Sequence, residues 1–322
     1  MRYAGGLGWP RLSGKTGKFS AGSMATRAGF RITHWQSRPS FAVYSGWTWR
    51  KTAFILPILT RLRVVAKNHL TPHYVSIVFT ADDVARFAHT TLGSNNKIFL
   101  PPPGQKDFEL PDFDFTTMKW MVQDERQRPI VRTYTHRSID IDKQTLTIDF
   151  ALHDGHSTAS AWADAAQLGD ELGVVMATEA ISLVPDNVQN YVFLCDASGL
   201  PATAALLERL SASAHAYVIA EVHGPEDELA LSSPAQLDIQ WLHNADPSQG
   251  SAITTALKAH ADIARLQDSR FAHIAAEHAT VRASRNFLRK EQGWTREECY
   301  ACAYWQIGRR EGESKTPPLM DD

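Results

Sequence analysis

From about residue 61 onward, the chain alternates apolar and polar residues with a period of two. This alternation is typical of half-buried β-strands, whose successive side chains point to opposite faces. Short polar turns such as "DIDKQ" (140–144) separate the runs. Several short strands at this spacing predict a closed antiparallel barrel. The predicted strands lie in "RLRVVAKNHL" (61–70), "HYVSIVFT" (73–80), "NKIFLPPPGQ" (96–105), "RPIVRTYTHRSI" (128–139), "TLTIDFALH" (145–153) and "DELGVVMAT" (170–178).

One predicted helix interrupts this series of strands. The segment "TASAWADAAQL" (158–168) is rich in alanine, and Ser157 or Thr158 provides a hydroxyl that can cap its first turn.

After "LVPDNVQN" (183–190) the pattern changes to apolar strands that alternate with amphipathic helices. Such alternation predicts a doubly wound parallel sheet. The predicted strands lie in "YVFLCDASG" (191–199), "AHAYVIAEV" (214–222), "QLDIQWLHN" (236–244) and "SRFAHIAAEH" (269–278), and the helices in "LPATAALLERLSA" (200–212), "SAITTALKAHADIARL" (251–266) and "TVRASRNFLRKEQG" (280–293).

The charge distribution separates an N-terminal segment from the rest of the chain. Residues 1–81 contain 12 Lys and Arg but no acidic residue, whereas the remainder holds 21 basic and 35 acidic residues. We therefore expect residues 1–58 to be a basic, disordered extension, 59–185 a barrel domain, and 186–322 an α/β domain with a C-terminal helical segment. A transit peptide, or an upstream start codon chosen in error, is an alternative interpretation of the extension.

Composition also excludes several classes of protein. The three cysteines form no CxxC pair, and the 13 histidines show no HExxH spacing, so we expect neither a structural metal site nor a disulfide framework. The apolar run "TAFILPILT" (52–60) is too short for a membrane span. The acidic remainder of the chain argues against a nucleic-acid partner. We expect a cytoplasmic monomer without a membrane span.

The segment "PIVRTYTHRSID" (129–140) carries the strongest candidate chemistry. On a strand, Arg132 and Tyr134 share one face, and Thr135 points the other way. The helix start downstream, with Ser157 and Thr158, is a favourable site for an anion. Arg132 and that helix start could hold one pyrophosphate, as a flavin dinucleotide requires. The alternative is an ordinary cross-strand pair on a sheet surface.

Six separated stretches resemble the siderophore-interacting proteins, the FAD-dependent ferric-siderophore reductases, whose barrel is of the ferredoxin-reductase type. They are "RTYTHR", "HDGHSTASAWADAAQLGDELGV", "FLCDASGLPATAALLERL", "QWLHN", "AAEHATVRASRNFLRKEQGW" and "AYWQIG". The resemblance covers roughly residues 60–310, and it implies an FAD-binding barrel followed by a domain that binds NAD(P)H.

The resemblance also implies roles for particular residues. Arg132 would hold the pyrophosphate, Tyr134 would pack on the isoalloxazine, and Thr135 would reach its N5 edge. The further FAD contacts implied are Thr133, His153, Ser157, Thr158, Ala159 and Ser160. The residues implied beside the nicotinamide are Asp196, Leu200 and Pro201. Lys97 and Arg137 are candidate substrate-binding residues, with a solvated strand-end lysine and an ion-paired arginine as the alternatives.

The sequence departs from the family pattern at three places. Ser157-Thr158 stands where the family has Gly-Pro, Cys195-Asp196-Ala197 stands for Gly-Asp-Glu, and Ala276 replaces a glycine before Glu277. In addition, His243 or Asn244 occupies the place of an arginine after the tryptophan motif.

The implied function is reduction of Fe(III) in a ferric siderophore, with FAD as cofactor and NADPH or NADH as electron donor. The acidic segment "HGPEDE" (223–228) slightly favours NADH, because carboxylates repel a 2′-phosphate. A ferredoxin is an alternative donor. Two rival functions are a reductase of the same fold with another acceptor and a siderophore-binding protein that has lost electron transfer.

Overall fold

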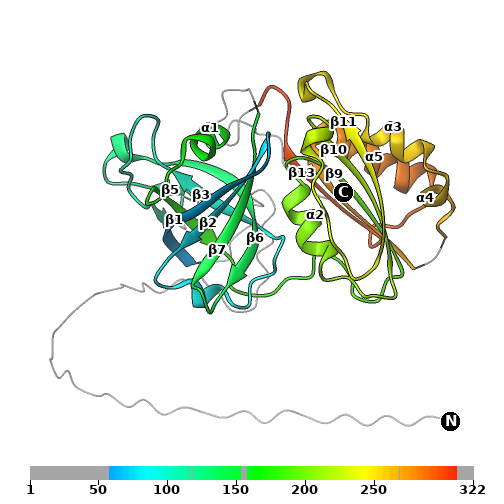
Figure 1. The fold of residues 1–322 in the computed structure, drawn as a ribbon, viewed down its shortest axis with the longest axis horizontal. Coiled ribbons are helices and arrows are strands. Elements are labelled where there is room, and N and C mark those ends of the chain that lie inside the picture. Colours follow the sequence, from blue (N-terminus) through cyan, green and yellow to red (C-terminus); the bar gives the residue numbers. More distant parts are fainter. Residues whose placement is uncertain (1–57, 115, 118, 154–157, 268, 310–322) are drawn as a thin grey trace, which may run out of the picture. The chain divides into compact units, whose positions relative to one another are not determined.

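A computed structural model describes residues 58–114, 116–117, 119–153, 158–267 and 269–309 of the chain. The predicted basic extension lies outside these residues. The first half of the described chain forms a closed antiparallel barrel of six strands in the order β1-β2-β7-β6-β3-β8, which confirms the predicted barrel (Figure 1). Its strands are β1 (Ile58–Thr71), β2 (Tyr74–Thr80), β3 (Asn95–Leu100), β6 (Ile130–Asp140), β7 (Thr145–Ala151) and β8 (Glu171–Met176).

The barrel interior is filled by the apolar residues of the alternating pattern. Ile77, Ile98, Ile148 and Val174 are completely buried in one cluster. Pairing of Ile58 with Met176 and of Arg63 with Glu171 closes β1 onto β8, so no open edge remains between these two strands. The short helix α1 (Thr158–Ala165) packs its Ala159 and Ala163 into the same cluster. The interior is thus a packed core.

The second half of the described chain forms a five-stranded parallel sheet in the order β11-β10-β9-β12-β13. Its strands are β9 (Asn190–Asp196), β10 (His215–Val222), β11 (Gln236–His243), β12 (Arg270–Glu277) and β13 (Cys299–Trp305). The helices are α2 (Leu200–Leu207), α3 (Ile253–Ala259), α4 (Ala261–Arg265) and α5 (His278–Asn286). This doubly wound arrangement was predicted, and the predicted domain boundary at 185/186 falls between β8 and β9.

The two faces of the parallel sheet are covered by different helices (Figure 1). Phe193 and Cys195 of β9 pack with Leu206 of α2, whereas Val192 and Leu194 face the helices α3 to α5. The alternation within β9 therefore builds two separate cores from one strand.

Tyr74, the first residue of β2, belongs to the core of the other half of the molecule. Its side chain is 3% exposed and lies in the cluster of Phe193, Leu200 and Leu206, not in the barrel core. The neighbouring turn is also tied to that half, because His73 donates from its backbone N to Asp227 Oδ1 (2.9 Å). The β1–β2 hairpin is thereby fastened to the parallel-sheet half.

Several local elements differ from the predicted ones. The helix predicted over 251–266 is two helices that meet at His260, whose φ of −79° and ψ of 97° are extended. The last helix passes from α5 into a π-helical turn, Phe287–Glu291. The small hairpin of β4 (Asp112–Asp114) and β5 (Lys119–Met121) and the edge strand β13 were not predicted. Among the described residues, no helix is long and apolar enough to cross a membrane.

Candidate functional site

The candidate flavin strand is β6, and its side chains alternate as predicted. Tyr134 packs against the barrel core and lies 4.6 Å, between ring centroids, from Phe150. Thr133 points to the other face, where its Oγ1 accepts a hydrogen bond of 2.5 Å from Lys97 Nζ. Arg132 is half-buried, and its Nη1 donates to the carbonyl oxygen of Val131 (2.8 Å). The strand therefore carries an arginine and an aromatic ring on one face and two threonine hydroxyls on the other.

Helix α1 is joined to this strand through aromatic side chains. Phe150 lies between Tyr134 and Trp162 of α1, and the ring centroids of Phe150 and Trp162 are 6.1 Å apart. Ser160, which is 4% exposed, accepts from the backbone N of His153 (3.1 Å) and so ties the helix to the end of β7. The structure thus brings the helix start and Tyr134 onto one part of the barrel. The predicted cap Ser157 lies outside the described residues.

Thr135 has a buried hydroxyl without a hydrogen-bond partner among the described residues. The residue is 3% exposed. The Tyr304 phenol of β13 is its neighbour: burial raises the pKa of that phenol and the contact with Thr135 lowers it, but the two oxygens do not meet hydrogen-bond geometry. An unpaired buried hydroxyl costs free energy unless something bonds to it. A ligand edge with a hydrogen-bonding nitrogen would satisfy it, so the residues present fit the flavin expected here.

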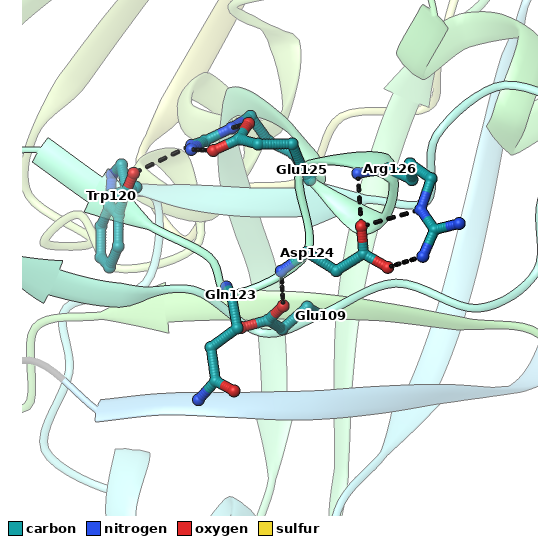
Figure 2. A network of polar contacts seen from close by, with 7 residues as sticks. Glu109, Trp120, Gln123, Asp124, Glu125 and Arg126 are labelled. Atoms are coloured by element: carbon teal, nitrogen blue, oxygen red, sulfur yellow. Dashed lines mark hydrogen bonds and ion pairs between the residues drawn. The ribbon is translucent and has the colours of Figure 1, made fainter.

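A network of hydrogen bonds orders the loop that leads into β6 (Figure 2). Glu109 accepts from the backbone N–H groups of Gln123 (2.8 Å) and Asp124 (3.0 Å). Asp124 in turn holds the Arg126 guanidinium through two bonds of 3.0 and 2.8 Å. Arg128 spans Glu125 and the carbonyl oxygen of Trp120 (2.9 Å). The network fixes the chain just before the candidate flavin strand begins.

The two candidate substrate residues differ in their surroundings. Lys97 faces Thr133. Burial raises the pKa of the Cys302 thiol, and the positive charge of Lys97 lowers it. Arg137 forms an ion pair with Glu208 at the end of α2, with Nη1 3.0 Å from Oε2 and a second bond from Nη2 to Oε1. In the structure, Arg137 is therefore an ion-paired arginine, which was the alternative to a substrate-binding role.

Asp196, at the carboxyl end of β9, accepts hydrogen bonds from five donors. Its Oδ1 accepts from Ser198 N (2.9 Å), Ser198 Oγ (2.5 Å) and Gly199 N (3.3 Å). Its Oδ2 accepts from Glu277 N (2.9 Å) and Trp305 Nε1 (2.8 Å). Burial raises the pKa of the Asp196 carboxyl, against the lowering effect of these bonds. The carboxylate joins the ends of β9, β12 and β13.

This arrangement follows from the topology, because β9 and β12 are neighbours from which the chain continues in opposite directions. Open α/β sheets bind ligands at such a switch point, outside the carboxyl ends of the strands. Leu200 and Pro201 begin α2 at this edge, although both side chains are buried. A Cβ on Gly199 would lie 2.1 Å from the carbonyl oxygen of Ala275, so only glycine fits this close approach.

Sequence reasoning missed three features of these surroundings. Tyr304 beside Thr135, Trp305 on Asp196, and Glu208 on Arg137 are all contacts between residues distant in the sequence. The near-terminal "YW" was a signal for the first two, but nothing local indicated their partners. Among the described residues, no group of three or more His, Cys, Asp or Glu side chains could hold a metal ion.

Two family models match the chain. The model of the siderophore-interacting FAD-binding domain matches residues 63–178, and the model of the siderophore-interacting protein matches residues 188–308. Ferric vibriobactin reductase ViuB of Vibrio cholerae is 29% identical over 250 residues, which are 78% of this chain and 90% of that protein. The NADPH-dependent ferric-chelate reductase of Escherichia coli is 29% identical over 253 residues, 77% of this chain and 91% of that protein.

Solved structures agree with the observed fold. A siderophore utilization protein from T. fusca superposes with a TM-score of 0.68 and 27% identity, over 79% of this chain and 95% of that chain. A ferredoxin NADP+ reductase from Neisseria gonorrhoeae with bound FAD and NADP superposes with a TM-score of 0.53 and 17% identity, over 75% of this chain and 97% of that one. The latter likeness establishes a ferredoxin-reductase-like fold.

Proposed function

The chain belongs to the siderophore-interacting protein family, and from this premise we propose that it is an FAD-dependent ferric-siderophore reductase that takes its electrons from NAD(P)H. The observation that carries the proposal is the buried, unpaired hydroxyl of Thr135 on the strand that also holds Arg132 and Tyr134.

The residues of the barrel bind and orient the cofactor in this proposal. Arg132 supplies positive charge for the pyrophosphate, Tyr134 supplies a flat ring, and Thr135 supplies a hydroxyl for the N5 edge. Thr133, His153 and the segment 157–160 would complete the phosphate and ribityl contacts. FAD, when bound, supplies the conversion of a two-electron donor into one-electron steps.

The electron donor is proposed to bind at the switch point of the parallel sheet, near Asp196, Leu200 and Pro201. The orientation of Asp196 is fixed by its five hydrogen bonds, so it would border the site and not move with the ligand. Asp227, in the acidic segment expected to contact the ribose, is 3% exposed and bonded to His73. That carboxylate therefore gives no preference for NADH, and both NADH and NADPH are proposed as donors.

Reduction itself explains release of the metal. Fe(II) is bound more weakly than Fe(III) by hard oxygen donors, so a reduced chelate gives up its iron. The decisive assay is anaerobic turnover of a ferric siderophore with NADPH or NADH in the presence of an Fe(II) trap. Trapped Fe(II) that depends on both protein and FAD supports the proposal, and its absence with all donors, a ferredoxin included, refutes it.

Replacing Arg132 tests the cofactor site. We expect Arg132→Ala to weaken FAD binding at least about tenfold, because a charge-assisted contact to phosphate is lost. Titration of the apoprotein with FAD, followed by flavin fluorescence, measures this. Arg63→Ala is the matched control, since Arg63 is an exposed strand arginine paired with Glu171. Equal FAD affinity in both variants would contradict the assignment.

The same titration separates the rival functions. A siderophore-binding protein that has lost electron transfer would take up no FAD. A reductase with another acceptor would take up FAD and be reduced by NAD(P)H, yet would release no iron from any chelate.

A further inference from the structure

Arg137 is neutralised by a carboxylate from the other half of the molecule. Its guanidinium makes two bonds to Glu208, and its side chain is 22% exposed. In this two-bond pairing, both terminal nitrogens of the guanidinium donate to the carboxylate and fewer N–H groups remain for a ligand. The charge of Arg137 is therefore already compensated within the chain.

Two more carboxyl groups line a cavity to which Arg137 also contributes. Asp149 and Glu228 line, together with Arg137 and Tyr74, a cavity of about 430 Å³. Asp149 is 5% exposed, and its Oδ1 has no hydrogen-bond partner among the described residues. Burial raises the pKa of the Asp149 carboxyl, and Glu228 is paired with His243 (2.9 Å), so Glu208 is the carboxylate that compensates the charge of Arg137.

Arg137 is nevertheless close to the candidate reaction site. It lies on β6 two residues after Thr135, at a β-bulge where the pairing with β7 shifts register between His136 and Ser138. On the other side of Thr135 along β6, Lys97 is held on Thr133. Two basic residues therefore flank the buried hydroxyl, and Glu208 compensates the charge of Arg137.

We propose that Glu208 is a specificity-determining residue that makes the protein prefer ferric chelates of low net charge, such as uncharged tris-hydroxamates, over trianionic tris-catecholates. The inference rests on the proposed function, because it assumes that the chelate approaches this face of β6. In the wild-type protein, Arg137 then fastens the barrel to α2 and offers the chelate no uncompensated charge.

The test uses gallium(III) chelates, which do not take up electrons under these conditions, so that binding is measured apart from catalysis. Isothermal titration of the FAD-loaded full chain gives Kd for a gallium tris-catecholate and a gallium tris-hydroxamate. We expect Glu208→Gln to tighten binding of the trianion roughly tenfold, because one unit of positive charge is unmasked. Binding of the uncharged chelate should stay within about twofold, and the gain should shrink as salt is added.

Glu171→Gln is the matched control, since Glu171 bridges Arg61 and Arg63 on the barrel. It should leave both affinities unchanged, and Glu208→Ala should reproduce the selectivity of Glu208→Gln. An unchanged ratio in Glu208→Gln, equal weakening of both chelates, or binding of neither chelate overturns the inference. Failure of the proposed function is a separate outcome, namely no Fe(II) released from the corresponding iron chelates.

Discussion

Removing the Asp196 carboxylate should destabilise the parallel-sheet half, because this group joins three strand ends. In Asp196→Ala, the Gly199 N–H keeps its bond to the Asp196 carbonyl oxygen (2.9 Å) and the Ser198 hydroxyl can turn elsewhere. The backbone N of Ser198 also loses its bond but is only half-buried, whereas Glu277 N and Trp305 Nε1 lose an acceptor that holds separate strand ends together. Donors left unpaired by the loss of a charged partner cost about 1.5–3 kcal/mol each, so we expect a loss of about 3–6 kcal/mol for the two.

For a protein of this size, that loss lowers the thermal midpoint by roughly 6–12 °C. The assay is a thermal melt of the FAD-loaded protein, followed by tryptophan fluorescence. Hydrogen exchange at the Glu277 amide provides a local readout, since its acceptor is the carboxylate itself. Asp196→Asn should retain the turn at Ser198 but lose the bonds of Oδ2, with a smaller fall.

Asp238→Ala is the control for this experiment. Asp238 lies on the edge strand β11, its side chain is 55% exposed, and it pairs only at the surface with His215. Exposed pairs of this kind contribute about 0–1 kcal/mol. If Asp196→Ala melts within about 2 °C of Asp238→Ala, the carboxylate does not hold the three strand ends together and the reasoning is wrong.

Two further predictions concern buried polar groups. Thr135→Val should leave the apoprotein as stable as the wild type or slightly more stable in thermal melts, because an unpaired hydroxyl is removed. The variant should slow reduction of the bound flavin in stopped-flow mixing with NAD(P)H, and Thr135→Ser should restore the rate. A large loss of apoprotein stability would contradict the prediction. Burial lowers the pKa of His136 and of His273 to about 4, below the ordinary value of 6.5. The stability contributed by the two neutral imidazoles is complete above pH 6.5 and is lost as the pH falls toward 4, by about 3 kcal/mol for each. Urea unfolding midpoints should therefore fall over this pH range, and they should fall less in His273→Phe. Equal acid sensitivity of that variant and the wild type would contradict the lowered pKa of His273.

The barrel could be predicted from the sequence because its strands are amphipathic and local. Alternation in 61–80 and 128–153 predicted β1, β2, β6 and β7 with small errors at their ends. Edge strand β13 was missed, since "CYACAYW" lacks clear alternation and its pairing with β12 is a long-range contact. The break at His260 involves neither glycine nor proline, so no local residue indicated it.

The candidate site was predictable in its residues but not in their pairing. The family motif drew attention to Arg132, Thr135 and Arg137, yet the partner of Arg137 is a glutamate 71 residues away in the sequence. Likewise, Asp196 and Trp305 are 109 residues apart and meet only because parallel strands end at one edge. Such contacts depend on the order of strands in the sheet, which periodicity does not determine.

The position of Tyr74 limits how this protein can be recombined with its relatives. The two family models meet between residues 178 and 188, which invites exchange of whole domains at that point. Yet Tyr74 belongs by sequence to the first domain and by packing to the core of the second. A chimera joined there would combine Tyr74 with a foreign second domain, or combine the native second domain with a foreign residue at the position of Tyr74. Functional exchange therefore requires the β1–β2 turn to be transferred together with the C-terminal domain, so the boundary suited to engineering is not the boundary along the chain.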